Sequence, residues 1–319
     1  MDVGSDYCRY KYCWTNFILS DGEAELLSLL EVKGLTKAYG AELAVDEVSF
    51  RLEERTSTAL IGPNGAGKTT TLSMLAGLLK QTKGTVDWNN GAGIGFLPQY
   101  PQYFPWLTAL EFIEMAAKLS GVDAKKARLQ SIRSLEFVGL GSALKKKTGT
   151  FSGGMKQRLG LAQAIVHQPK LLLLDEPVSA LDPTGRREIM NLLKSLQQDT
   201  TILYSTHILN DAEEMTDQLL FMQHGRLVEQ GSLAEVKARF AEPRIRIRFG
   251  DSTAAAGFAE SCGWESIVER NTVFLPAVED GLDMQDVLKT LAQKETGVLG
   301  VERQTASLEE IFLKVVSGK

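Results

Sequence analysis

The stretch Gly62-Pro-Asn-Gly-Ala-Gly-Lys-Thr69 decides the fold of this chain. It fits the pattern G-x-x-x-x-G-K-[ST], in which a glycine-rich turn joins a buried strand to a helix and binds phosphate. The apolar run Thr58–Ile61 before it predicts the strand, and the pattern of Lys68–Leu79 after it predicts the helix. An accidental glycine turn would lack these flanks, so we interpret the stretch as a phosphate site.

The chemistry of this loop suits a nucleoside triphosphate. Glycines let the backbone curl until successive N–H groups point inward, and the N-terminus of the helix adds partial positive charge. We expect Lys68 to reach the β- and γ-phosphates and the Thr69 hydroxyl to ligate Mg²⁺. The loop residues expected to bind the nucleotide are Gly62, Asn64, Gly65, Ala66, Gly67, Lys68, Thr69 and Thr70.

Length and composition exclude several classes of protein. A chain of 319 residues accommodates about two domains. Its net charge of −5 gives no basic surface for nucleic acid, and no apolar run reaches the ~18 residues of a membrane helix. Cys8, Cys13 and Cys262 form neither a disulfide framework nor a complete zinc site, and residues 1–30 lack the pattern of a signal peptide.

Between Leu30 and Phe240, β-rich runs alternate with helical patterns. Such alternation predicts an α/β domain with a mainly parallel sheet, here over residues 30–240 with a helical subdomain at about 100–166. Residues 1–29 are expected to form a loosely ordered N-terminal extension. The strands are expected at Leu29–Val32, Val48–Leu52, Thr58–Ile61, Ile94–Leu97, Leu171–Leu174, Thr201–Tyr204, Gln218–Met222 and Arg226–Glu229. The helices are expected at Lys68–Leu79, Thr108–Leu119, Ala124–Val138, Gly153–Val166, Thr184–Gln197 and Ala234–Phe240.

After Ala241-Glu-Pro243 the order of elements changes, and residues 241–319 are expected to form a small α+β domain. Its first six elements read β-α-β-β-α-β, the ferredoxin-like order, and a final helix follows at Leu308–Val316. Those six are Arg244–Phe249, Thr253–Cys262, Ser266–Glu269, Thr272–Leu275, Asp283–Gln293 and Val298–Arg303.

Two further stretches indicate chemistry. Asp175 and Glu176 end the apolar strand Leu171–Leu174, where Asp175 would hold Mg²⁺ through a water and Glu176 would orient or deprotonate an attacking water. The alternative is a surface acid pair at a strand end. Ser152 is expected to cap a helix that begins with Gly153 and Gly154, which leaves N–H groups free for an anion; on spacing alone this is also an ordinary capped helix.

Taken together, these motifs resemble those of the nucleotide-binding subunit of an ATP-binding-cassette (ABC) transporter. Phe151-Ser-Gly-Gly-Met155 resembles the signature motif, although Phe151 and Met155 depart from the usual leucine and glutamine. Leu171–Pro177 resembles Walker B and Ser179–Asp182 the D-loop. Three single residues match family positions: Gln99 the Q-loop glutamine, His207 the switch histidine, and Tyr39 the aromatic that stacks on adenine.

The resemblance implies roles for these residues and a mechanism. Catalysis would involve Glu176, His207, Lys68 and Gln99, with Mg²⁺ held by Thr69, Gln99 and Asp175. ATP would also be contacted by Tyr39, Ser152, Gly153, Gly154 and Asp182. Two chains, identical or related, would sandwich two ATP molecules, with the signature residues of one chain over the γ-phosphate bound by the other. ATP would close the dimer and hydrolysis would open it.

Separate membrane subunits are the partners that the resemblance implies, and it places the chain at the cytoplasmic face of the cell membrane. The aromatic side chains of Tyr100, Tyr103, Phe104 and Trp106 are expected to form an exposed groove that receives a helix of such a subunit; the alternative is a loop packed on its own domain. Leu308–Lys314 resembles the terminal segment of ATPases that serve the second type of ABC exporter. A non-transport ABC ATPase acting on ribosomes or DNA repair complexes, and an inactive structural subunit, are the competing readings. The cargo stays open.

Overall fold

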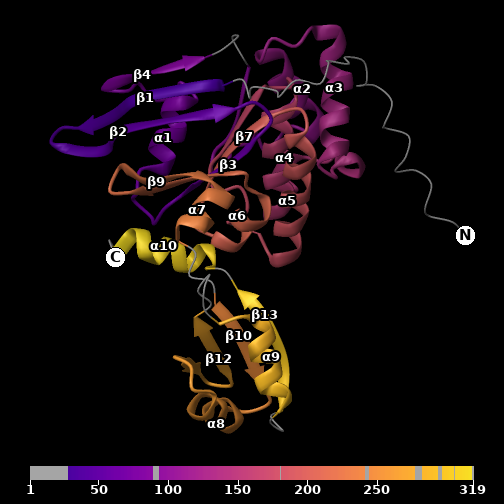
Figure 1. Cartoon of the computed structure of the whole chain (residues 1–319). Helices are drawn as coiled ribbons and strands as arrows, with labels where there is room; N and C mark the ends of the chain where they lie inside the picture. Colours follow the sequence, from indigo (N-terminus) through magenta and orange to yellow (C-terminus); the bar gives the residue numbers. More distant parts are fainter. Residues whose placement is uncertain are drawn as a thin grey trace, which may run out of the picture.

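The computed structural model describes residues 28–88, 93–179, 181–240, 244–276, 282–293, 297–304 and 306–317. It consists of two bodies (Figure 1). The larger body, which we call the N-terminal body, contains residues 28–240, and the smaller C-terminal body contains residues 244–304. Cys8, Cys13 and nearly all of the expected N-terminal extension lie outside the described residues, whereas Leu29 already belongs to a strand.

A mainly parallel sheet forms the centre of the N-terminal body, as predicted. The described strands follow the spatial order β5-β6-β7-β3-β8-β9, and only β9 runs antiparallel to its neighbour. Both faces are covered, because alternate residues of β6 enter different cores: Leu172 and Leu174 contact one, Leu171 and Leu173 the other. The strands are β3 Ser57–Ile61, β5 Ile94–Leu97, β6 Leu171–Leu174, β7 Thr201–Thr206, β8 Gln218–Gln223 and β9 Arg226–Ser232.

The first strands of the chain form a second, antiparallel sheet with the order β2-β1-β4. They are β1 Ser28–Tyr39, β2 Glu42–Glu53 and β4 Lys83–Trp88. The sequence pattern did not predict β4, because Lys83-Gly-Thr-Val-Asp-Trp88 lies at an edge, is largely exposed, and shows no apolar run. Gly84 has φ +88 and packs directly on the backbone of Gly34, so a side chain has no room there.

The helices of the N-terminal body match the predicted ones with shifted ends. Helix α1 stops at Leu75 rather than Leu79, because Gly77 adopts φ +72 just after its C-cap. The short helix α6 was not predicted, since its 7 residues carry no side-chain N-cap. The helices are α1 Lys68–Leu75, α2 Ala109–Leu119, α3 Ala124–Phe137, α4 Gly153–Ile165, α5 Pro183–Gln197, α6 Leu209–Met215 and α7 Leu233–Phe240, with short 3-10 turns at Gly141–Ala143 and Thr148–Thr150.

The C-terminal body has the predicted ferredoxin-like topology. Its described strands are antiparallel with the order β11-β12-β10-β13, and α8 and α9 connect them. The apolar side chains of β10 enter a separate core, in which the rings of Phe249 and Phe258 lie 5.4 Å apart. The elements are β10 Arg244–Phe249, α8 Ser252–Cys262, β11 Ile267–Glu269, β12 Thr272–Pro276, α9 Met284–Ala292 and β13 Val298–Gln304.

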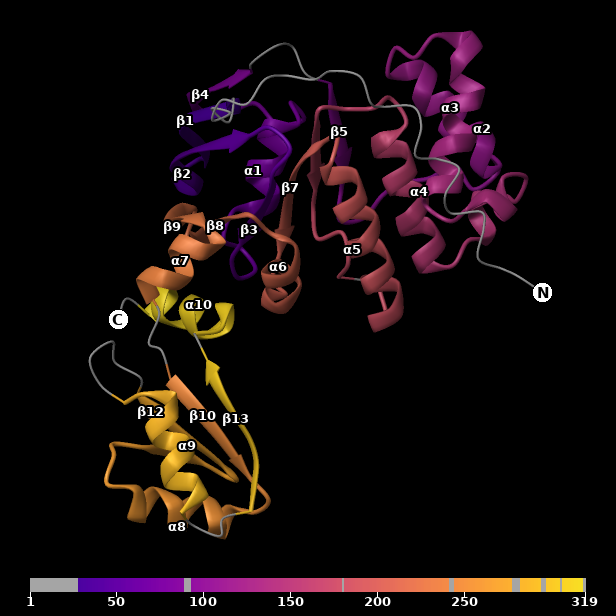
Figure 2. The ribbon, with the colours of Figure 1, turned by 45° about the vertical axis from the view of Figure 1, so that its right-hand side comes forward.

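The last helix, α10 Leu308–Ser317, returns to the N-terminal body (Figure 2). Leu308 and Ile311 are fully buried in the core of that body, and the ring of Phe312 lies 5.9 Å from that of Phe221 in β8. The division of the chain at residue 240 stays a prediction, but α10 packs with the elements before that point rather than with the C-terminal body.

Candidate nucleotide site

The residues predicted to act on the nucleotide follow the ends of neighbouring parallel strands. Leu97 of β5 pairs with Leu174 of β6, and Ile61 of β3 pairs with Thr206 of β7. Gln99, Asp175, His207 and Gly62 therefore emerge at one edge of the sheet, because carboxyl ends of parallel strands meet there. Sequence alone predicted each position, and the strand order brings them together.

The phosphate loop leads from β3 directly into α1. Gly67 is the N-cap of α1 with φ 103, no side chain caps the helix, and its first turn holds no acidic residue. A Cβ at Gly67 would lie 2.5 Å from the carbonyl oxygen of Ala44 in β2, so only glycine fits. The uncapped amides and the helix dipole thus present an anion site, with Asn64, Gly65 and Thr69 exposed around it.

Lys68 lies within this loop, with only 7% of its side chain exposed. Its Nζ donates hydrogen bonds to the carbonyl oxygens of Gly62 (2.6 Å) and Pro63 (3.2 Å), and lies 3.8 Å from Glu176 Oε1. Burial lowers the pKa of the ammonium, and the carboxylates of Glu176 and Asp175 oppose that shift. A phosphate would offer this cation a charged acceptor in place of two neutral carbonyls.

Asp175 and Glu176 are held by a residue that the sequence analysis did not single out. The Ser205 hydroxyl at the end of β7 donates to Asp175 Oδ1 (2.6 Å) and accepts from the amide of Glu176 (2.9 Å). Glu176 adopts φ 49, a left-handed conformation that costs energy in a residue with a side chain. The sequence signal that could have identified Ser205 was a hydroxyl group within a fully buried strand. A buried hydroxyl requires polar partners.

His207 contacts the other side of the same carboxylate. Its Nδ1 lies 2.8 Å from Glu176 Oε2, and since an ionised carboxylate only accepts, Nδ1–H is the donor. The imidazole remains 52% exposed, whereas Glu176 is buried. Glu176 is therefore fixed between Lys68 and His207, and the histidine ring stays accessible from solvent.

Thr69, Asp175 and Gln99 supply oxygen donors of the kind that Mg²⁺ prefers. Mg²⁺ typically uses one or two protein ligands, several waters and substrate phosphates. Asp175 engages one oxygen with Ser205 and retains the second. Among the described residues, no cluster of three or more His, Cys, Asp or Glu could hold a metal by itself. The donor set thus fits a magnesium ion that is bound together with phosphate.

The predicted signature residues lie at the start of α4. Ser152 is the N-cap, its hydroxyl accepting from the amide of Met155 at 3.3 Å, and Gly153 and Gly154 form the first turn. Phe151 is buried, and Met155 packs against the core, so its side chain makes no polar contact on the helix surface. Of the two departures from the usual motif, Phe151 keeps an apolar side chain, and only Met155 replaces a polar side chain with one that packs on the core.

A hollow separates this turn from the D-loop. It is lined by Ser152–Met155 on one side and by Leu181, Asp182 and Gly185 on the other, and its lining includes no residue of the phosphate loop. Asp182 caps α5, accepting from the amide of Gly185 at 2.9 Å. Ala180 lies outside the described residues.

Tyr39 is the last residue of β1 and is 54% exposed. The Nζ of Lys37 lies 5.1 Å from its ring centre. The hairpin that begins at Tyr39 continues into β2, whose Ala44 abuts Gly67. The exposed ring of Tyr39 is thus available to stack on a flat ligand. It lies at the start of a hairpin that reaches the phosphate loop.

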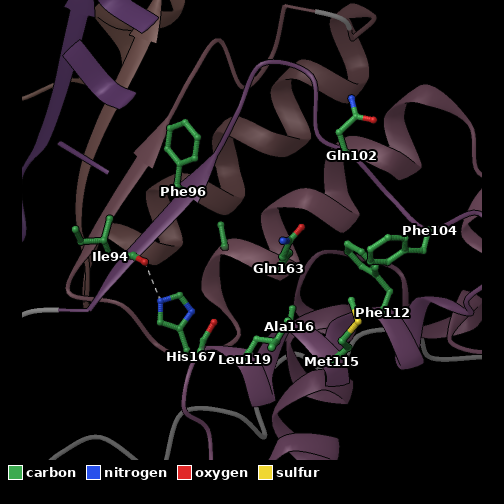
Figure 3. A pocket seen from close by; sticks show the side chains of 12 residues that line it. Ile94, Phe96, Gln102, Phe104, Phe112, Met115, Ala116, Leu119, Gln163 and His167 are labelled. Atoms are coloured by element: carbon green, nitrogen blue, oxygen red, sulfur yellow. Dashed lines mark hydrogen bonds between the residues drawn. The ribbon is translucent and has the colours of Figure 1, made fainter. Parts of the chain in front are cut away.

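The aromatic segment after Gln99 divides into exposed and packed residues. Tyr100, Phe104 and Trp106 are exposed. Tyr103 instead packs on its own domain: its hydroxyl donates to the carbonyl of Lys156 in α4, and burial raises its pKa. Beside this segment runs a groove of about 410 Å³ between β5, α2 and the end of α4, into which Phe104 points (Figure 3). Tyr100, Tyr103 and Trp106 do not line the groove, which corrects the expectation that all four aromatics form it.

Two family models together cover most of the chain. The model described as "ABC transporter" matches residues 45–179, and the model described as "ATP-binding protein DrrA1-3-like, C-terminal domain" matches residues 231–316. A further model, an AAA domain described as a putative AbiEii toxin, matches only residues 149–210.

Curated relatives align over nearly their whole length. The uncharacterized ABC transporter ATP-binding protein YxlF of Bacillus subtilis is 43% identical over 90% of this chain and 99% of its own. The bacitracin transport ATP-binding protein BcrA of Bacillus licheniformis is 33% identical over 91% of this chain and 98% of its own. The daunorubicin/doxorubicin resistance ATP-binding protein DrrA of Streptomyces peucetius is 31% identical over 89% of this chain and 91% of its own.

Solved structures agree with these relatives. An ATP-binding subunit of an ABC transporter superposes with a TM-score of 0.61 at 29% identity, over 67% of this chain and 93% of its own. A dimeric ATP-binding cassette in a post-hydrolysis state with ADP and Pi gives a TM-score of 0.58 at 27% identity, over 64% of this chain and 98% of its own. No helix among the described residues is long and apolar enough to span a bilayer.

The strand-end constellation, the capped glycine turn of α4 and these comparisons point to one conclusion. The chain belongs to the family of ABC-transporter ATP-binding subunits, as an ATPase that carries a DrrA1-3-like C-terminal domain.

Proposed function

We propose that the chain acts as half of a dimer in which each ATP contacts the phosphate loop of one subunit and Ser152–Gly154 of the other. The observation that carries this proposal is the glycine pair of α4. A Cβ at Gly153 would meet no described atom within 4 Å, and a Cβ at Gly154 only an ordinary contact with Leu181. Each glycine costs a helix about 1 kcal/mol relative to alanine. Since their own chain does not require them, an external ligand that approaches the backbone closely explains both.

Within each site we assign the roles as follows. Lys68 and the loop amides bind the β- and γ-phosphates, Tyr39 stacks on the base, and Thr69, Asp175 and Gln99 hold Mg²⁺, which neutralises phosphate charge when bound. Glu176 orients and deprotonates the attacking water, and His207 fixes Glu176 and faces the γ-phosphate. The signature amides stabilise charge on the transferred phosphoryl group, and Asp182 couples the two sites of the dimer.

The dimer would drive a membrane permease formed by separate chains, which binds near Tyr100–Trp106 and holds the ATPase at the cytoplasmic face of the membrane. Support comes from the exposed rings of this segment and the groove beside it. The names of the relatives BcrA and DrrA favour export of an antibiotic or drug-like compound. A ribosomal or DNA-repair role, the competing reading, is not favoured by any of these relatives.

A complementation experiment tests the shared site. Lys68→Ala disables both phosphate loops of a homodimer, and Ser152→Arg disables both signature turns. A mixture of the two variants contains dimers with one intact composite site, so ATPase activity should return to about a quarter of the wild-type level for random pairing. If each variant is inactive and the mixture stays inactive, the sites are not shared between chains.

A second experiment identifies the partner. The full chain is purified from its native membrane under mild detergent, and its companions are identified by mass spectrometry. A polytopic membrane protein in constant ratio to the chain is the expected result. Recovery of ribosomes or DNA-bound complexes in its place would contradict the transport role.

A further inference from the structure

Helices α5 and α6 lie side by side in both views of the molecule (Figure 1, Figure 2). Helix α5 follows the D-loop and is capped by Asp182, whereas α6 begins at Leu209, shortly after His207. Apolar side chains of both helices, among them Ile189 and Met215, enter the same core. The helices thus join, within one chain, the residue proposed to couple the two sites and the residue proposed to fix the catalytic base.

Each helix carries a charged residue close behind its functional residue. Arg186 lies one turn after Asp182, and its amide donates to the carbonyl of Asp182 at 2.9 Å. Asp211 lies in the first turn of α6, after His207. No side chain caps α6, which has only 7 residues, so contacts with neighbouring elements must fix its position. A contact between Arg186 and Asp211 would therefore bear directly on where His207 lies.

The two charged side chains approach each other without bonding. Nε of Arg186 lies 3.8 Å from Oδ2 of Asp211. Both atoms are buried, and neither has a hydrogen-bond partner among the described residues. Charge-assisted bonds of this kind span about 2.7–2.9 Å, and Arg246 and Glu302 form one at 2.9 Å. An approach of about 1 Å would therefore satisfy both atoms at once.

The open gap is unfavourable for both groups. Burial raises the pKa of the Asp211 carboxyl, the charge of Arg186 opposes that shift, and the charge of Glu214 adds to it. A buried donor and a buried acceptor that lack partners each cost free energy. A pair that served only the stability of the fold would be closed here. A complementary pair that stays open is suited to a contact that forms when the helices move.

From this geometry we infer that Arg186 and Asp211 are positioning residues that bond to each other when ATP closes the dimer. The bond draws the first turn of α6 toward α5 and holds His207 against Glu176. Because the pair acts through His207, it affects the rate of hydrolysis rather than the binding of nucleotide to the phosphate loop. This inference rests on the proposed dimer and adds a link, within each chain, between the D-loop and the switch histidine.

A double-mutant cycle tests the pair in the full chain. Arg186→Met keeps the length of the side chain and removes its donors, and Asp211→Leu removes the carboxylate. We expect each variant to lower kcat for ATP about tenfold, and the double variant to lower it about tenfold as well rather than about a hundredfold. The affinity for ADP, which does not hold the two chains together in the proposed cycle, should stay within about threefold of wild type.

Conservative variants and a neighbouring arginine supply the controls. Asp211→Glu keeps the carboxylate with a longer reach, and Arg186→Lys keeps the positive charge, so each should retain kcat within about threefold of wild type. Arg187→Met, at the exposed next position of α5, should leave kcat within about twofold. Melting temperatures identify any variant that is simply unfolded.

A purely structural pair would show its coupling in stability instead. The wild type and the three cycle variants are therefore also unfolded with denaturant in the absence of nucleotide, where we expect the two substitutions to act additively. The inference is overturned if the two substitutions multiply in kcat, or if coupling in unfolding equals or exceeds coupling in kcat. It is also overturned if Asp211→Glu is as slow as Asp211→Leu.

Failure of the inference can be told apart from failure of the proposed dimer. If Lys68→Ala and Ser152→Arg complement each other while the cycle shows no coupling in kcat, the shared site stands and only the role of Arg186 and Asp211 falls. If the two variants do not complement each other, the shared site itself is wrong, and the inference falls with it.

Discussion

Glu176, which we propose as the catalytic base, has unusual surroundings. It is buried, its backbone has φ 49, and it contacts a lysine on one side and a histidine on the other. Strain of this kind persists only where the surrounding contacts fix the residue, and it is concentrated at functional sites. In the proposed mechanism, this constraint would hold the carboxylate where it can deprotonate a water that attacks the γ-phosphate.

Substituting Glu176→Gln should stop hydrolysis while leaving nucleotide binding intact. The amide keeps the size of the side chain but is not a base, so we expect turnover to fall at least ~10²-fold. With ATP and Mg²⁺ the variant should elute as a nucleotide-bound dimer on size-exclusion chromatography. A monomer with unchanged turnover would refute the assigned role.

Ser205 should matter for activity although it contacts no substrate. Ser205→Ala leaves the Glu176 amide without an acceptor and Asp175 Oδ1 without a donor, so we expect about 1–3 kcal/mol lower unfolding free energy. ATPase activity should fall about tenfold or more, because the carboxylates lose their orienting partner. Ser205→Thr, which keeps the hydroxyl, should retain most activity.

The control for this comparison is Ser195→Ala at an exposed position of α5, where the hydroxyl donates to the carbonyl of Asn191. It should change neither the unfolding free energy nor the ATPase rate appreciably. A Ser205→Ala enzyme with normal activity would show that backbone geometry alone positions Asp175 and Glu176.

At the scale of elements, α4 connects the two surfaces that we propose to be functional. Ser152–Gly154 begin the helix, Gln163 and Ala164 near its end line the groove beside the aromatic segment, and Tyr103 bonds to the carbonyl of Lys156 between them. The helix has 13 residues, which spans about 20 Å. If a permease docks beside the aromatic segment as proposed, a rigid helix of this kind would link it physically to the signature turn.

Helix α10 should be necessary for the stability of the N-terminal body. Ile311 is fully buried in the core that also contains Phe221 and Val236. Ile311→Ala should lower the unfolding free energy by about 2–5 kcal/mol, measured by denaturant unfolding. Leu313→Ala removes a side chain on the outer side of the same helix that is 61% exposed. It should change the unfolding free energy by no more than about 0.5 kcal/mol. Equal effects would mean that α10 does not form part of that core in solution.

At the scale of the whole molecule, the exposed aromatic segment is where we expect the ATPase to meet its permease. Trp106 is 64% exposed, packs beside Phe104 and does not belong to the core. Trp106→Ala should therefore uncouple transport from ATP hydrolysis, measured in vesicles that contain the complete transporter, while nucleotide affinity stays unchanged. Loss of nucleotide binding would instead assign Trp106 a structural role.

The sequence by itself determined the motifs, the fold class and the ferredoxin-like order of the C-terminal body. Each of these depends on local signals: glycines where the backbone must turn tightly, apolar runs such as Leu171–Leu174, and caps such as Ser152. Elements with weak local signals, β4 and α6, were missed because neighbouring elements rather than their own patterns stabilise them.

Only the tertiary structure decided which distant residues meet. The β5-β6-β7-β3 order brings Ser205 to Asp175 and His207 to Glu176, and it makes β1, β2 and β4 a separate sheet. Packing also returns α10 to the N-terminal body and leaves Nε of Arg186 and Oδ2 of Asp211 without a hydrogen bond among the described residues. Periodicity shows which face of an element is buried but not which element covers it. The hydrophobic effect is non-directional, so shape and hydrogen bonding between distant parts of the chain decide which elements pack together.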